Sequence, residues 1–186
     1  MAKRTDPEVL LADAALKVLA KKAWRDVTLA EVAKAAKVPL RHVANVAPAK
    51  PALVGLILRR IGDKLTASYK ADSGTQSGRD RLFDVSMAWF DVLGSHKPAV
   101  RSLYKGMRND PLTLLSVRDA IVSAAEWLMT LAQADTGPAL QLRALAFAAV
   151  LGRAIPVWLD DDRDLTKTMA QLDGDLRRGE SWLGRG

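Results

Sequence analysis

Three polar residues with the chemistry to read base edges, Arg41, His42 and Asn45, stand close together in the short stretch LRHVANVA. Arginine can pair with the O6 and N7 acceptors of guanine, and asparagine can pair with adenine. Leu40 opens the same stretch and is counted with them. The spacing predicts a nucleic-acid-reading surface on a short helix, and the alternative is a surface helix whose polar side chains are simply solvated.

A second group of residues has the chemistry to hold phosphate groups. Thr28 offers a hydroxyl beside a predicted helix start, and Lys37 and Lys50 offer ammonium groups. Hydroxyls, ammonium groups and helix N-termini are the usual donors to phosphate oxygens. We therefore expect these three residues near a nucleic-acid backbone.

The elements that must position these residues are two short helices joined by a turn. Thr28 and Glu31 form a T-x-x-E capping box, which predicts a helix beginning at Leu29. Lys37 falls in the turn, and Pro39 can start the second helix because the N–H that proline lacks would have no partner there. Two short helices in this order predict a helix-turn-helix.

Apolar residues recur at helical spacing through the rest of the chain. Asp6 and Pro7 predict the start of a first helix that ends near Lys22, with Trp24 and Val27 folding back onto it. Further helices are expected at 52–70, 79–95, 98–108, 111–132, 138–159 and 165–183. The prediction is an all-α fold of about nine helices, with a three-helix helix-turn-helix head over residues 1–50 and a helical ligand-binding and dimerisation body over residues 51–186.

The positive charge is confined to the N-terminal part of the chain. Residues 1–70 hold 14 lysines and arginines against 6 acidic residues, whereas residues 71–186 hold 14 against 15. Such asymmetry is typical of a nucleic-acid-binding end joined to a neutral body. A basic surface that serves only solubility is the alternative.

Several function classes are not expected. The chain has no cysteine, and its two histidines, His42 and His96, are not spaced as a metal pair. The acidic run Asp160–Asp162 lacks the spaced ligands of a calcium loop and is interpreted as a helix end. No catalytic triad or phosphate loop can be assembled. We expect no enzyme, no cofactor and no metal, and a soluble cytoplasmic protein without a signal sequence or an apolar run long enough to cross a bilayer.

The order of these features resembles the TetR family of transcriptional regulators. The resembling text is AALKVLAKKAW, DVTLAEVAKAAKV, a short helix and then PAKPAL. The matching positions are Trp24, Thr28, Val32, Ala33, Ala36, Val38, Lys50 and Leu53. The resemblance implies a homodimer that places two recognition helices on a palindromic operator of double-stranded DNA. It also implies a small apolar ligand in the body and regulation of transcription, with repression as its direction.

The chain departs from that family at the recognition helix. Lys37 replaces the usual turn glycine, and Ala44, Val46 and Ala47 replace a tyrosine, a histidine and an aromatic residue. These departures leave open whether DNA binding is retained.

A second resemblance gives the alternative function. RDRLFDVSMAWFDVL, VWLDDD and MAQLDGDLRRGESWL are similar to the coenzyme-Q biosynthesis lipid-binding family, whose members have a TetR-like fold. It implies an isoprenoid-binding accessory protein with a vestigial head and a terminal helix at a membrane. Residues 165–186 carry only four basic groups against three acidic ones, so attraction to an anionic membrane is weak. The apolar seam of that segment, formed by Leu165, Met169, Leu172, Leu176 and Leu183, equally suits packing against the body or a second subunit.

Large apolar side chains are spread over the predicted body helices. The expected ligand pocket is lined by Trp89, Phe90, Met107, Trp127, Phe147 and Trp158. Aromatic residues and methionines at helical spacing also fill ordinary cores, and this alternative stays open for each of them.

Overall fold

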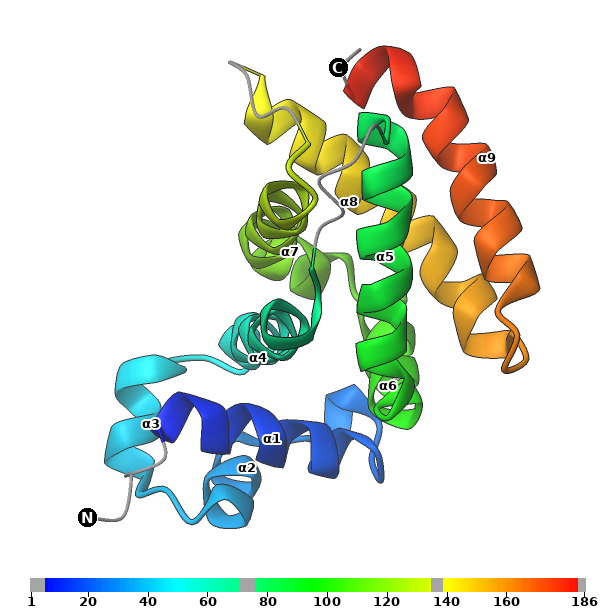
Figure 1. The fold of residues 1–186 in the computed structure, drawn as a ribbon. Helices are drawn as coiled ribbons and strands as arrows, with labels where there is room; N and C mark the ends of the chain where they lie inside the picture. The colour runs from blue at the N-terminus through cyan, green and yellow to red at the C-terminus, as the bar shows by residue number, and fades with distance from the viewer. Residues whose placement is uncertain (1–5, 71–75, 135–138, 184–186) are drawn as a thin grey trace. The chain divides into compact units, whose positions relative to one another are not determined.

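The computed structural model describes residues 6–70, 76–134 and 139–183, and side chains up to residue 179. Within these residues the chain is all-α, with nine α-helices, one 3₁₀ turn and no strand (Figure 1). The helices are α1 (Pro7–Leu19), α2 (Leu29–Ala36), α3 (Leu40–Val46), α4 (Ala52–Ser68), α5 (Gly78–Gly94), α6 (Lys97–Arg108), α7 (Pro111–Leu131), α8 (Leu140–Asp160) and α9 (Thr166–Leu183), with η1 (Trp24–Asp26) between α1 and α2. The predicted fold class is confirmed.

The chain forms two compact units. The first comprises Met1–Ile61 and Ser95–Ala120, and the second comprises Gly62–Gly94 and Ile121–Gly186. Two helices, α4 and α7, contribute residues to both units. The units are defined by which parts of the chain contact one another. The predicted boundary at residue 50 separates a DNA-binding part from a ligand-binding part, and it stays a prediction.

Local capping chemistry sets the start of the first helix. The Asp6 carboxylate accepts a hydrogen bond of 2.9 Å from the Glu8 N–H, and Pro7 occupies the first turn. This satisfies one of the N–H groups that a helix start leaves without a partner. The helix ends at Leu19, earlier than the predicted end near Lys22.

The core of the first unit is built by α1, which contacts α2, α3 and α6. Its apolar face is buried, as are Trp24 and Val27. The turn η1, which carries Trp24, contacts α6, and the packing of Trp24 and Val27 onto α1 stays a prediction. The predicted apolar face of α4 is also buried: Leu53, Leu56, Ile57 and Ile61 in this unit, and Leu65 in the second unit, are all at most 3% exposed. The helix-turn-helix therefore rests on an apolar support, which fixes α2 and α3.

In the second unit, α9 packs along α8 and α5 (Figure 1). Leu172 and Leu176 of α9 are fully buried, so this part of the terminal apolar seam packs inside the unit. Leu183, the last residue of that seam, lies outside the described side chains. Of the two uses expected for the seam, packing against the body is the one observed for these leucines.

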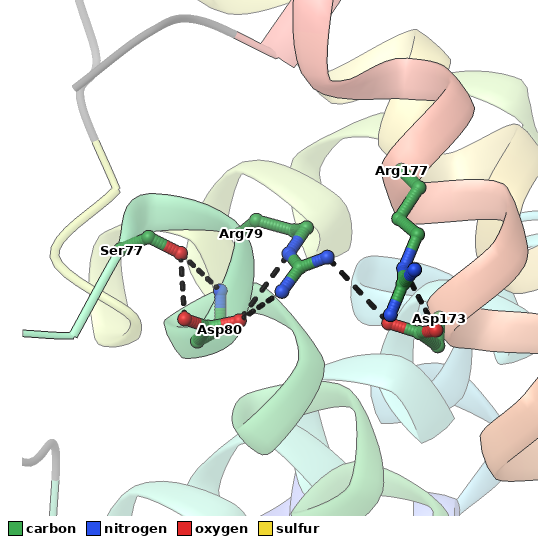
Figure 2. Close-up of polar contacts among 5 residues, drawn as sticks. All are labelled: Ser77, Arg79, Asp80, Asp173 and Arg177. Carbon is green, nitrogen blue, oxygen red and sulfur yellow. Dashed lines mark hydrogen bonds and ion pairs between the residues drawn. The ribbon is translucent and has the colours of Figure 1, made fainter.

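Polar contacts join α5 to α9 at the surface. The Arg79 guanidinium donates to the neighbouring Asp80 at 2.8 Å and lies 3.7 Å from Asp173 of α9, which also pairs with Arg177 at 3.0 Å (Figure 2). Ser77 accepts a hydrogen bond from the Asp80 N–H and so caps the start of α5. Such exposed ion pairs contribute little stability each, and the buried leucines hold α9 in place.

Helix α8 is long and apolar enough to cross a membrane by length and composition, and within the described residues this holds for α8 alone. The expectation concerned uninterrupted apolar runs and is not contradicted, because Arg143 and Arg153 interrupt α8 and the helix qualifies only by its average hydropathy. A core helix of a soluble protein passes the same test, so the observation is weak evidence for a span.

Candidate nucleic-acid interface

The second helix of the helix-turn-helix, α3, buries little of its surface. Val43 is 1% exposed and anchors the helix, whereas Leu40, Arg41, His42, Ala44 and Asn45 are exposed. Leu40 is 56% exposed. An apolar side chain at this position can contact a thymine methyl group in a major groove.

The polar side chains of α3 are not used by the fold. Within the described part of the chain, the side chains of Arg41, His42 and Asn45 have no hydrogen bond or ion pair to another residue. Arg41 and Asn45 are four residues apart, so they lie on the same face of the helix. The structure thus brings the three predicted base-reading residues together on one exposed helix.

The turn between α2 and α3 requires a left-handed residue, and Lys37 supplies it. Lys37 has φ 56° and ψ 34°, and the Val38 N–H donates to the Ala33 carbonyl at 3.0 Å. This is the Schellman arrangement that glycine usually serves, because a Cβ atom makes the left-handed conformation unfavourable. The conformation expected from the sequence is therefore present, and the Lys37 side chain is exposed beside α3.

Thr28 begins α2, but only half of the predicted capping box forms. The Thr28 hydroxyl oxygen accepts from the Glu31 N–H at 3.2 Å. The Glu31 carboxylate pairs instead with the Lys22 ammonium at 2.5 Å, because the end of α1 lies within its reach. The hydroxyl of Thr28 keeps its own hydrogen, which can be donated to a phosphate oxygen.

Lys50, the third predicted phosphate contact, is engaged with the 3₁₀ turn η1. Its Nζ donates to the Arg25 carbonyl oxygen at 3.1 Å and lies 4.7 Å from the centre of the Trp24 ring. Burial lowers the pKa of Lys50, and the carboxylates of Asp26 and Asp110 oppose this shift. Lys50 therefore links the start of α4 to η1. Its other ammonium N–H groups can still donate to a phosphate.

Trp24 fits against α6 because the opposing residue is glycine. A Cβ atom at Gly106 would lie 2.6 Å from the Trp24 Cβ and 2.7 Å from its Cδ1. The indole is only 4% exposed. Sequence reasoning missed this contact, although a glycine inside a predicted helix is a signal of close approach.

The residues predicted for a ligand pocket fall into two groups. The Phe90 ring meets Trp89 edge-to-face at 5.2 Å between ring centres and lies tilted against Trp158 at 5.4 Å, and these rings and Phe147 are buried. Trp127 is 47% exposed and donates from its indole N–H to the Thr66 hydroxyl at 3.2 Å. Met107 belongs to the first unit and the other five to the second. The pocket stays a prediction.

The fold is shared with solved structures of TetR transcriptional regulators. The TetR transcriptional regulator from Nitrosomonas europaea ATCC 19718 matches with a TM-score of 0.65 and 16% identity over 94% of this chain and 98% of that chain. A TetR transcriptional regulator from Rhodococcus sp. RHA1 matches with a TM-score of 0.59 and 19% identity over 97% and 96%.

The TetR family repressor AlkX from Dietzia sp. strain DQ12-45-1b, implicated in biodegradation of n-alkanes, matches with a TM-score of 0.53 and 18% identity over 98% and 97% of the two chains. No family model and no curated protein matches the chain. None of these three structures is described as a coenzyme-Q biosynthesis protein. All three are described as transcriptional regulators.

Proposed function

We propose that this chain is a homodimeric, DNA-binding transcriptional regulator of the TetR type. The observation that carries the proposal is the exposed face of α3, where Arg41, His42 and Asn45 have no partner within the described residues and Val43 alone anchors the helix. A helix of this kind in a helix-turn-helix enters the major groove with its N-terminal residues on base edges. Thr28 and Lys37 then contact the flanking phosphates.

The proposed second copy is supported by the exposed side of α8. Leu142 is 63% and Leu145 40% exposed, and Ala149 and Gly152 continue the same stripe at alternating spacings of three and four residues. A Cβ atom at Gly152 would meet no other atom within 4 Å. A stripe with this spacing and small residues lets a second helix approach closely. Pairing through α8, with α9 beside it, would give the two-fold symmetry that matches a palindromic operator.

The proposed response to a ligand runs through α4. Trp127 of α7 lies against α4, with its indole N–H bonded to Thr66 and its Cδ1 3.4 Å from the Cβ position of Gly62. An apolar ligand that contacts this half-exposed ring would shift α4 and change the spacing of the two heads. This works only if the ligand binds the two arrangements with different affinity. Repression is proposed as the direction of control because the Dietzia protein is described as a repressor.

The proposal is tested by titrating the full-length protein with the DNA that flanks its own gene, and with a scrambled duplex, at two salt concentrations. We expect tight binding to the native flank that weakens as salt rises, because phosphate contacts release counterions. Arg41→Ala is expected to cost about 1–3 kcal/mol and to relax specificity at one base position.

Arg118→Ala is the matched control, since Arg118 is an exposed arginine of α7 outside α3. It removes the same charge and should leave base specificity unchanged. Equal, weak binding to both duplexes by the unmodified protein would refute the regulator. Lipid extraction and mass spectrometry would then test the isoprenoid-binding alternative.

A further inference from the structure

A groove of about 890 Å³ in the first compact unit has six lysines and arginines among its seventeen described lining residues. It is bordered by the end of α1, η1, the segment before α4, and α6. Its cationic lining residues are Lys21, Lys22, Arg25, Lys50, Arg101 and Lys105, and Asp110 is the one carboxylate among the described lining residues. Arg41, His42 and Asn45 do not line it, so the groove is separate from the proposed DNA-reading face.

Acidic partners neutralise only part of this charge. Lys22 pairs with Glu31 at 2.5 Å, and Arg25 lies 3.6 Å from Asp26. Within the residues that the structure describes, Lys21 and Lys105 have no acidic partner.

The lining carboxylate is already engaged elsewhere. Asp110 accepts from the Thr113 N–H at 3.1 Å and from the Thr113 hydroxyl at 2.6 Å, and so caps the start of α7. The Thr113 hydroxyl also holds the pKa of Asp110 below its ordinary value. The groove therefore keeps an excess of positive charge after its internal pairs are counted.

Helix ends do not remove that excess. The C-terminal ends of α1 and α6, which carry partial negative charge, border the groove, but so do the N-terminal ends of α4 and α7. These partial charges oppose one another, so the lysines and arginines determine the sign of the charge in the groove. The groove also has apolar lining residues, among them Leu19, Trp24, Pro51 and Pro98.

We propose that this groove binds a small polyanion that carries two or more phosphate or carboxylate groups. Its volume is within the range of small-molecule sites and far exceeds that of one inorganic ion. Cations on three separate segments, Lys21 after α1, Lys50 before α4 and Lys105 on α6, suit a ligand with several charged groups. Since the groove joins η1 to α6 beside Trp24, a bound anion holds these segments together.

The first experiment titrates the full-length protein with inorganic pyrophosphate by isothermal calorimetry, in a low-salt buffer without phosphate. We expect one saturable site per chain and an affinity at least tenfold lower in Lys21→Glu and in Lys105→Glu. Lys17→Glu is the matched control, because Lys17 also lies in the last turn of a helix and outside the groove. It makes the same change in net charge and should leave the affinity within twofold.

Two results would overturn the proposal. One is the absence of saturable binding in a protein whose circular dichroism shows it folded. The other is an equal loss of affinity in Lys17→Glu and Lys105→Glu, which would mean general charge attraction. Arg41→Ala separates this proposal from the regulator, since it should weaken DNA binding and leave pyrophosphate binding unchanged.

DNA phosphates offer the same chemistry as a free polyanion, and a second measurement distinguishes the two sources. If the groove holds DNA phosphates, pyrophosphate competes with DNA and Lys105→Glu lowers the salt slope of DNA binding by about one. If it holds a free polyanion, both ligands bind together and the slope is unchanged. Either result supports the groove as an anion site and assigns its ligand.

Discussion

At the scale of single residues, the contact between Trp24 and α6 depends on one missing side chain. Gly106 lies in a helix, where glycine is less stable than alanine by about 1 kcal/mol. That cost is offset because the Trp24 ring occupies the space that a Cβ atom would take. The Lys50 ammonium lies over the same ring, 4.7 Å from its centre. A glycine, an indole and a lysine thus connect α6, η1 and the start of α4.

Gly106→Ala is therefore expected to destabilise the protein by about 1–3 kcal/mol, although alanine favours a helix. The added methyl meets the Trp24 Cβ, an atom close to the backbone that cannot rotate away. Urea unfolding followed by circular dichroism measures the loss. Gly94→Ala is the control, since nothing lies within 4 Å of its Cβ position, and it should be neutral or slightly stabilising. Equal stability of the two variants would contradict the close contact.

Lys37→Gly should stabilise the fold by about 1 kcal/mol, because glycine adopts the left-handed conformation of this turn without a Cβ penalty. Lys34→Gly, inside α2, removes the same charge and should destabilise the fold by about 1 kcal/mol. Thermal unfolding of both variants tests the pair. If Lys37 also contacts a phosphate, its replacement weakens DNA binding while it raises the melting temperature.

Single-residue contacts divide into those that the sequence indicates and those that it does not. The left-handed conformation of Lys37 could be predicted, because Lys37 stands where the resembled family has its turn glycine. The partner of Glu31 could not, because Lys22 reaches it only after α1 and α2 have packed. Lys50 was expected at a phosphate, and its hydrogen bond to the Arg25 carbonyl depends on a fold that brings together residues 25 positions apart.

At the scale of elements, most helix boundaries follow from local chemistry. The predicted and observed ends of α4 to α9 differ by no more than two residues, because proline, capping residues and turn sequences act within a few positions. Burial of the apolar face of α4 could likewise be predicted from its spacing. The interaction that starts α9 was not predicted, since it comes from a residue of the acidic run that was interpreted only as a helix end.

That residue is Asp161, which links the end of α8 to α9. Its carboxylate accepts hydrogen bonds of 2.7 Å from both the N–H and the hydroxyl of Thr168. Burial raises the pKa of Asp161, but these hydrogen bonds lower it more, and the pKa lies below its ordinary value. The stabilisation is therefore complete above the ordinary carboxyl pKa of about 4 and is lost as the pH falls through the lowered pKa of the folded state.

Asp161→Asn should lower the melting temperature at neutral pH and flatten its dependence on pH below about 4. Asparagine keeps the size of the side chain but loses one of the two acceptor oxygens and the charge. Melting curves from pH 6 to pH 3 test this against Asp162→Asn, an exposed neighbour that should retain the slope of the unmodified protein. A variant with an unchanged slope would show that Asp161 does not link the two helices.

At the scale of the whole molecule, the exposed apolar surface of α8 is suited to contact with a second copy of the chain. Leucines that are 63% and 40% exposed on a helix of this length are costly to leave in water. The sequence shows an apolar helix, but only the packing of α9 against one side of it reveals which residues remain uncovered. A second copy covers the same stripe on both chains at once, as a two-fold interface requires.

Leu142→Glu combined with Leu145→Glu should therefore yield a folded monomer, because it places two charges in the proposed interface and leaves the buried side of α8 unchanged. Light scattering coupled to gel filtration measures the mass, and circular dichroism checks the fold. Leu112→Glu, at a 78% exposed leucine of α7 outside the stripe, is the control and should remain dimeric. The monomer should also bind a palindromic operator far more weakly, since two linked heads raise each other's effective concentration on the DNA. If the double variant stays dimeric, the interface does not lie on this face of α8. If it becomes monomeric with unchanged operator affinity, recognition by paired heads is contradicted.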